Sequence, residues 1–213
     1  MINKPAGMSS FGVVARVRRV LSRDQGRKVK VGHTGTLDPF ATGLMILVIG
    51  KECRNAGDYS KLDKVYTATI RLGQNSTTGD PEGELTDIST DTPDLASVQM
   101  TLEKFTGKIT QKPPIYSAIK INGQRAYKLA RAGEAVEMPE RQIEIFSLEL
   151  IDYSYPLIKI RTHVSSGTYI RTLAEDIGTA LGTGAYCSEL RRVSINKWNV
   201  SDAKKLSDFG VDD

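Results

Sequence analysis

The sequence contains few residues that bind metal ions or form disulfides. Among its 213 residues are two histidines and two cysteines, Cys53 and Cys187. The cysteines lie far apart and match no zinc or redox spacing, so we expect neither a structural zinc nor a disulfide framework. No second histidine or carboxylate accompanies His33 at a ligand spacing, and we therefore expect no metal site. A reducing compartment is the expected environment.

Long apolar segments and secretion signals are also missing. The run LMILVIG, residues 44–50, is far shorter than the about 20 apolar residues that cross a bilayer. The N-terminus lacks the charged-then-apolar order of a signal peptide. We therefore predict a cytoplasmic protein with no membrane partner.

Motifs of the common cofactor-dependent enzymes are absent as well. The sequence has no Walker-type phosphate loop, no serine elbow and no dinucleotide-binding fingerprint. Enzymes of those classes are disfavoured, and we expect no cofactor.

Charge is sorted into blocks, although the formal net charge is only +4. Residues 16–30 carry seven basic side chains and one acid, and residues 104–131 carry seven basic side chains and no acid. Residues 75–103 carry seven acids and no base. A basic block is about as often a solvated face as a track for a polyanion, which binds through release of counterions. Charge alone leaves both interpretations open.

The periodicity of the apolar residues predicts an α+β fold in a single domain, residues 1–213. Helices are expected over 9–23, capped by Ser9 or Ser10, and over 92–107, capped by Thr92 with Pro93 in the first turn. Within 165–182 a Ser/Gly turn is expected to continue as a helix that ends at Gly182, and shorter helices are expected near Tyr127 and from Ser201. Strands are expected over 43–50, 65–73, 141–153, 157–165 and 187–195.

Two further segments are expected to be irregular. Residues 75–84 are rich in turn formers, which predicts a surface loop. Residues 111–136 contain paired prolines, an Asn-Gly turn signal and much of a basic block. We interpret the second segment as a long excursion that a partner orders.

The stretch GHTGTLDPFATG, residues 32–43, places a single acid, Asp38, among glycines and threonines. Pro39 disfavours the helical conformation at Asp38 and favours an extended one. The glycines let the backbone turn tightly or approach a bulky group. A lone Asp-Pro pair is more often a turn carboxylate than a catalytic group, so the loop alone assigns no chemistry.

Two other residues are candidates for a site. Tyr66 alternates with polar neighbours on a predicted strand, so it points into the core, the commoner case, or into a cleft. Arg171 stands beside Tyr169 at a helix start and is either a surface charge or a buried partner for a carboxylate. A guanidinium beside an acid keeps the acid ionised, as a nucleophilic carboxylate must be.

Taken together, ordered segments over nearly the whole chain resemble the bacterial TruB family, enzymes that make pseudouridine in the T-loop of transfer RNA. The matching segments are NKPAGMSS, GHTGTLDPFATGLMILVIG, KVYTATIRLGQNSTTGDPEGE, PPIYSAIKINGQRAYKLARAG and SSGTYIRTLAEDIGTALGTGAYCSELRRVSI. The resemblance implies the pseudouridine synthase fold, with a mixed, largely antiparallel central sheet flanked by helices. It also implies a thumb-like RNA-binding insertion over about residues 108–136.

The resemblance assigns roles to individual residues. Asp38 corresponds to the nucleophile, attacking the base at C6 or the ribose at C1′, and Arg171 to its ion-pair partner. Tyr66 corresponds to the tyrosine that stacks on the flipped base and takes part in proton transfer. The positions that contact or pack around the flipped nucleotide are His33, Tyr169 and Leu190. The thumb residues expected to bind RNA are Lys112, Lys120, Arg125 and Lys128.

The family also sets expectations about partners. The T-arm of transfer RNA is the expected partner of a monomer that uses no guide RNA and no cofactor. Bacterial members usually continue into a C-terminal PUA-type RNA-binding domain, and that domain is expected to be absent because the sequence stops at Asp213. The alternatives are a guide-dependent ribonucleoprotein subunit, an RNA chaperone without chemistry, and a basic α+β binding domain.

Overall fold

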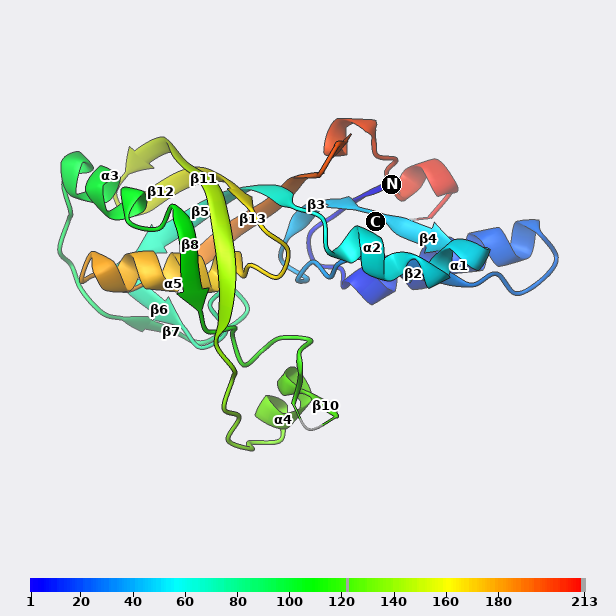
Figure 1. The fold of residues 1–213 in the computed structure, drawn as a ribbon, viewed down its shortest axis with the longest axis horizontal. Helices are drawn as coiled ribbons and strands as arrows, with labels where there is room; N and C mark the ends of the chain where they lie inside the picture. The colour runs from blue at the N-terminus through cyan, green and yellow to red at the C-terminus, as the bar shows by residue number, and fades with distance from the viewer. Residues whose placement is uncertain (122, 212–213) are drawn as a thin grey trace. The chain divides into compact units, whose positions relative to one another are not determined.

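The structure is a computed structural model that describes residues 1–121 and 123–211. Its helices are α1 (Ser10–Asp24), α2 (Ala56–Ser60), α3 (Leu95–Glu103), α4 (Ala126–Arg131) and α5 (Ile170–Ala180), with 3₁₀ helices at Gly50–Arg54, Val200–Asp202 and Ser207–Phe209 (Figure 1). The strands are β1 (Ile2–Lys4), β2 (Val31–His33), β3 (Thr42–Met45), β4 (Leu47–Ile49), β5 (Lys64–Leu72), β6 (Gln74–Ser76), β7 (Leu85–Asp87), β8 (Gly107–Gln111), β9 (Lys120–Ile121), β10 (Gln124–Arg125), β11 (Arg141–Ser154), β12 (Leu157–Val164), β13 (Ala185–Ile195) and β14 (Trp198–Asn199).

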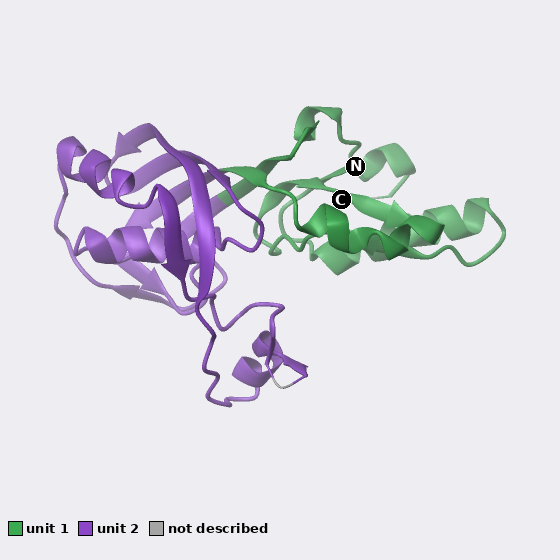
Figure 2. Ribbon diagram, in the orientation of Figure 1, with its two compact units in different colours: residues 1–66, 190–213 green, residues 67–189 purple. Residues whose placement is uncertain are grey.

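The chain forms two compact units, Met1–Tyr66 with Leu190–Asp213, and Thr67–Glu189 (Figure 2). The main sheet has the strand order β1-β3-β13-β5-β12-β11-β8, with β14 paired to β13, and the unit boundary falls within β5 and β13. The β3–β13 pairing is parallel, whereas β1–β3, β11–β12 and β8–β11 are antiparallel. The α+β class with a mixed, largely antiparallel sheet is therefore confirmed, while the single domain stays a prediction.

In the first unit, α1 begins where the sequence predicts. The Ser9 side chain accepts a hydrogen bond from the Gly12 amide at 3.0 Å, and this capping satisfies one of the free amides of the first turn. Val13, Val14 and Val17 of α1 are buried, and Val14 packs in one cluster with Val29 and Val31.

The apolar run 43–50 forms two strands, so the prediction of a single strand is wrong. β3 pairs with β1 and β13, whereas β4 pairs with β2 in a separate sheet. The chain changes partner at Ile46, whose carbonyl accepts a hydrogen bond from the Thr34 amide at 3.2 Å. A run that is apolar throughout carries no local signal of such a change.

In the second unit, the strands expected over 141–153 and 157–165 are confirmed as β11 and β12, which pair antiparallel, and α5 buries Ile170, Leu173 and Ile177. Helix α3 starts later than predicted. Asp94, not Thr92, is its N-cap, because the Asp94 carboxylate accepts a hydrogen bond from the Ser97 amide at 2.7 Å.

Other differences lie in connecting segments. Residues 77–84 form the turn between β6 and β7, so the predicted loop is confirmed there, but Gly79 and Asp80 within this turn are buried. The helix expected from Ser201 is replaced by 3₁₀ turns at Val200–Asp202 and Ser207–Phe209.

The basic insertion leaves the sheet after β8 and returns at β11, and Figure 1 shows α4 and β10 beyond the ends of these strands. The predicted helical turn near Tyr127 is confirmed as α4, and residues 108–111 belong to β8. Asn122 of the expected Asn-Gly turn lies outside the described residues. Over the described ranges, no helix has both the length and the apolar character that crossing a bilayer requires.

Candidate active site

The loop that carries Asp38 joins β2 to β3 and is fixed at its centre. Leu37 is buried, and its amide donates to the Ser10 hydroxyl while its carbonyl accepts from that hydroxyl, both at 2.8 Å. Asp38 follows as a half-buried residue, and its carbonyl accepts from the Ala41 amide at 3.2 Å. Helix α1 therefore positions the residue immediately before Asp38.

Two buried cations hold other parts of this loop by its carbonyls. Lys4, which is 1% exposed, donates from Nζ to the carbonyl of Pro39 at 3.0 Å. Arg192, also 1% exposed, donates to the carbonyls of Leu44, Gly35 and Thr36. Sequence reasoning missed both residues. The only local signals were their places in the sequence: Lys4 lies in the NKP segment, and Arg192 is the second of two arginines after Leu190.

A third cation, Lys64, is buried near the same loop. It lies two residues before Tyr66 and donates to the carbonyls of Ser60 and Leu62. Burial, and then the positive charge of Arg192, lower the pKa of the Lys64 ammonium to about 8. The interior around this loop is therefore rich in positive charge.

The remaining predicted residues of this unit are partly or fully buried. Tyr66 is 6% exposed and Leu190 is 8% exposed, which agrees with the inward orientation predicted for Tyr66. His33 is half-buried at the end of β2, where it pairs with Leu47 of β4. Their contacts with a nucleotide stay predictions.

In the second unit, Arg171 lies in the first turn of α5 with a side chain only 3% exposed. Its Nη1 lies 3.3 Å from Asp80 Oδ2 and donates to the Thr78 carbonyl, and Nη2 donates to the Tyr116 carbonyl at 2.9 Å. Of the two alternatives for Arg171, the buried partner of a carboxylate is confirmed, and Asp80 is such a carboxylate. The predicted ion pair with Asp38 stays a prediction.

Asp80 is itself held in place. Its Oδ1 accepts from the Thr78 hydroxyl at 2.6 Å and from the Glu82 amide at 3.0 Å. A buried ion pair is stable only when its remaining polar atoms are also satisfied, and these bonds satisfy the carboxylate. Sequence reasoning missed Asp80 because its turn-rich neighbourhood indicated exposure.

One turn further along α5, Glu175 faces the turn that carries Asp80. A methyl group added at Gly79 would lie 2.4 Å from Glu175 Oε1, and Gly79 has φ +73°. Burial raises the pKa of Glu175 to about 7; Arg171 opposes this rise, whereas Asp176 and Asp80 add to it. Burial also raises the pKa of Asp176.

Tyr169 precedes α5 and is anchored through its main chain. Its amide donates to Gln111 Oε1 at 2.8 Å, and its carbonyl accepts from Gln111 Nε2 at 3.0 Å. The Arg141 guanidinium lies 5.9 Å from the centre of the Tyr169 ring. Gln111, which is 1% exposed and was missed from the sequence, therefore connects β8 to the start of α5.

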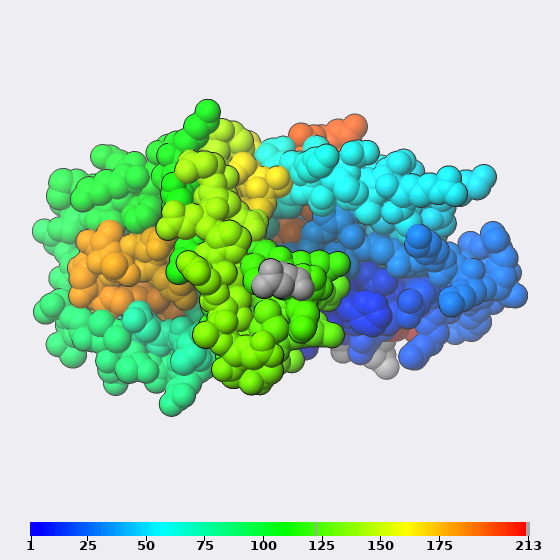
Figure 3. All heavy atoms as spheres, turned by 60° about the horizontal axis from the view of Figure 1, so that its bottom comes forward, coloured from blue at the N-terminus to red at the C-terminus, as the bar shows by residue number. Residues whose placement is uncertain are grey.

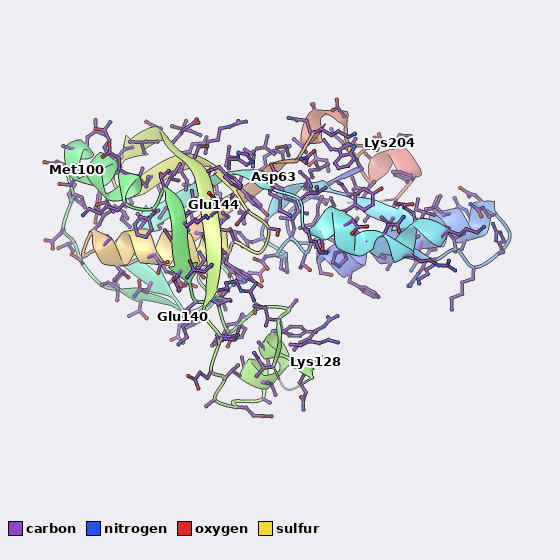
Figure 4. The ribbon with its side chains drawn as sticks, viewed as in Figure 1. Asp63, Met100, Lys128, Glu140, Glu144 and Lys204 are labelled. Atoms are coloured by element: carbon purple, nitrogen blue, oxygen red, sulfur yellow. The ribbon has the colours of Figure 1, made fainter. Side chains whose placement is uncertain are left out.

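The predicted thumb carries its cations on the outside. The four residues expected to bind RNA are all exposed: Lys112, Lys120, Arg125 and Lys128. Figure 4 shows Lys128 on α4 and Glu140 where the chain returns to β11, and Figure 3 shows the green surface of the insertion beside β11. Such a surface suits a polyanion, because cations that neutralise phosphates release the counterions condensed on the polyanion.

Comparisons with known proteins agree with the resemblance. Residues 18–170 match the family described as TruB family pseudouridylate synthase (N terminal domain). Residues 171–210 match the family described as tRNA pseudouridylate synthase B C-terminal domain. Together these matches span both compact units.

Curated relatives and solved structures are similar as well. The chain is 44% identical to tRNA pseudouridine synthase B of Cupriavidus taiwanensis, covering 100% of the chain and 67% of the relative. It is 44% identical to the protein of the same name from Burkholderia lata, covering 97% of the chain and 62% of the relative. The chain thus spans about two thirds of the length of these relatives.

Among solved structures, the crystal structure of a Cbf5-Nop10-Gar1 complex superposes with a TM-score of 0.74 at 28% identity, covering 97% of the chain and 51% of the neighbour. A structure of an H/ACA RNP bound to a substrate RNA containing 2'-deoxyuridine gives a TM-score of 0.71 at 25% identity, with 97% and 50% covered. The fold is that of the pseudouridine synthases, and the chain belongs to the TruB family of pseudouridylate synthases.

Proposed function

We propose that this protein converts a T-loop uridine of transfer RNA to pseudouridine, with Asp38 as the nucleophile and without a cofactor. The names of the curated relatives support transfer RNA as the substrate. The observation that carries the proposal is how firmly the backbone around Asp38 is held. Hydrogen bonds from Ser10, Lys4 and Arg192 reach carbonyls on both sides of it. Such preorganisation is what a positioned nucleophile requires.

The chemistry of the product accounts for the absence of a cosubstrate. The N-glycosidic bond from C1′ to N1 breaks, a carbon–carbon bond from C1′ to C5 forms, and the proton of C5 is lost while N1 gains one. No atom group or electron is exchanged with a second molecule. Asp38 attacks either C6 of the base or C1′ of the ribose, and Tyr66 takes part in the proton transfer.

The base must leave the folded RNA loop before a half-buried carboxylate can reach it. Extrusion costs a few kcal/mol. Stacking on an aromatic ring such as Tyr66 returns about 1 to 3 kcal/mol per base. His33, Tyr169 and Leu190 complete the surroundings of the flipped nucleotide in this proposal.

Arg171 has two partners in the proposed reaction cycle. It holds Asp80 within its own unit, and we propose that it also stabilises the ionised form of Asp38. A fixed guanidinium favours the charged form of a nearby acid. The basic thumb grips the T-arm, and the protein acts as a monomer in the cytoplasm.

A second candidate function is that of a ribonucleoprotein subunit, which the solved neighbours favour because they are described as protein complexes and an RNP. The higher identity to proteins named tRNA pseudouridine synthase B favours the stand-alone enzyme.

The test is mass-resolved mapping of pseudouridine in an unmodified transfer RNA transcript incubated with the protein alone. We expect pseudouridine at one T-loop uridine. Product only after a guide RNA is added would support the ribonucleoprotein subunit, and no product in either case would contradict both functions.

A further inference from the structure

We propose that Arg192 is a positioning residue for the reaction, fixing the loop that presents Asp38 through main-chain carbonyls on both sides of it. This inference rests on the proposed function, in which Asp38 acts on the uridine. Arg192 does not touch the substrate in this proposal; it acts through the loop.

The hydrogen bonds of Arg192 bracket Asp38 along the chain. Nη2 donates to the Gly35 carbonyl at 3.1 Å and Nη1 to the Thr36 carbonyl at 3.4 Å, both before Asp38. Nε donates to the Leu44 carbonyl at 2.7 Å, in the strand that follows the loop. One planar group therefore joins the start of the loop to its end, and the fork of a guanidinium suits this geometry better than a single ammonium does.

Two glycines of the stretch that carries Asp38 lie next to Arg192. Arg192 pairs with Gly43 in the parallel β3–β13 ladder. A methyl group at Gly43 would lie 2.3 Å from the Arg192 carbonyl oxygen, and Gly43 has φ +107°, a region that side chains rarely adopt. A methyl group at Gly35 would lie 3.6 Å from Arg192 Nη1. Gly43 therefore lets β3 approach the main chain of Arg192 closely, and Gly35 lies in ordinary contact with its guanidinium.

The buried charge of Arg192 also supports a positioning role. All three of these bonds go to carbonyls, so none of them neutralises the buried cation. Burying a charge is costly, and a link that served only packing could be made by neutral residues at lower cost. A buried cation beside a loop that carries a single acid, Asp38, fits a role in positioning that acid.

The neighbouring Arg191 provides a matched control. It is half-buried on the same strand, and successive residues of a strand point to opposite faces. Its Nη1 contacts Thr42 Oγ1 at 3.3 Å and Asn3 Oδ1 at 3.5 Å, both side-chain atoms outside the loop.

The experiment compares single-turnover rates of the full chain carrying Arg192→Gln, Arg192→Lys or Arg191→Gln on a transfer RNA transcript at saturating enzyme. A displacement of a reacting group by about 1 Å costs on the order of a hundredfold in rate. We expect a rate constant lowered by about that factor in Arg192→Gln, a partial recovery in Arg192→Lys, and a rate near wild type in Arg191→Gln. The dissociation constant for transfer RNA should change little in all three.

The rate constant separates positioning from stability. A purely structural role would lower only the concentration of folded enzyme, and the rate constant at saturating enzyme would stay unchanged. That result, or equal rate constants in Arg192→Gln and Arg191→Gln, would overturn the inference. An inactive wild-type protein would instead overturn the proposed function and, with it, this inference.

If the Arg192 variants fail to fold, the wild-type protein still tests the geometry. The Arg192 Nε proton, bonded to the Leu44 carbonyl, should exchange with solvent far more slowly than that of the exposed Arg23 in NMR measurements. Exchange as fast as that of Arg23 would overturn the inference.

Discussion

Buried charged side chains decide what individual residues can do in this protein. Arg171 and Asp80 form an ion pair whose side chains are 3% and 6% exposed. Arg192 and Lys4 place their charges on carbonyls of the Asp38 loop. Each of these charges is kept in the interior by several hydrogen bonds, so removing one partner leaves the other uncompensated.

The first prediction concerns the Arg171–Asp80 pair. Asp80→Asn keeps the shape of the side chain but leaves the buried guanidinium without this counter-charge, and breaking a buried pair costs about 3 to 5 kcal/mol. We expect the free energy of unfolding in urea to fall by about 3 kcal/mol. Asp91→Asn, in the same acidic block but exposed, is the control and should leave it nearly unchanged. Equal stability of both variants would contradict the importance of the pair.

Candidate residues with a local signal could be predicted, whereas their partners could not. The alternation of the strand placed Tyr66 inward, and the helix start offered Arg171 as a partner for an acid. Asp80 was missed because turn formers surround it, and its burial comes from Arg171, far along the chain. Arg192 was missed because its role depends on a strand pairing with Gly43 that no local pattern encodes.

At the scale of elements, α5 connects the predicted site residues of its unit to the β6–β7 turn. Arg171 and Glu175 both lie on α5 and face the turn that contains Gly79 and Asp80. The longer helices and strands could be predicted, because the spacing of their apolar residues reflects one buried face. The split between β3 and β4 could not, because both halves of the run are apolar.

The second prediction is a pH dependence set by Glu175. Its folded-state pKa of about 7 lies above the ordinary 4.5, so the folded protein binds the proton more tightly than the unfolded chain. This contribution to stability is complete below pH 4.5 and is lost as the pH rises to about 7. Asp176, with a raised pKa, acts in the same direction.

Glu175→Gln removes the titration while keeping a similar shape. We expect the variant to be more stable than wild type above pH 7, with the difference shrinking as the pH falls towards 4.5. Urea unfolding across this range measures it. Glu103→Gln, exposed at the end of α3, is the control and should show no such trend. A difference in stability that does not vary with pH would contradict the account.

At the scale of the whole molecule, the proposed function requires binding of an RNA as well as the chemical step. The sorted charge of the sequence left a solvated face and a polyanion track both open, and the insertion between β8 and β11 carries exposed cations. Charge blocks could be read from the sequence because they are local. The RNA atoms that these charges contact could not be predicted from the sequence, because these contacts depend on the structure of the partner.

The third prediction tests the thumb as the RNA track. Replacing Lys112, Lys120 and Arg125 by glutamine should flatten the dependence of log affinity on log salt. The variant makes fewer phosphate contacts, so fewer counterions are released when it binds. Filter binding over a salt series measures the slope. A control removes three exposed cations outside the insertion: Lys51, Lys159 and Arg161. An equal change of slope in both triple variants would show that the thumb is not the track.

The central claim is that this chain makes pseudouridine with Asp38 as its nucleophile, and single-turnover formation of pseudouridine by Asp38→Asn tests it most directly. Asparagine keeps the shape of the loop residue and removes the charge that attacks. The account predicts that binding of the transfer RNA transcript stays close to wild type while pseudouridine formation is abolished. This outcome would also separate the enzyme from a chaperone, whose refolding of the RNA needs no nucleophile. Retained turnover in Asp38→Asn, with the wild-type protein active, would contradict the claim.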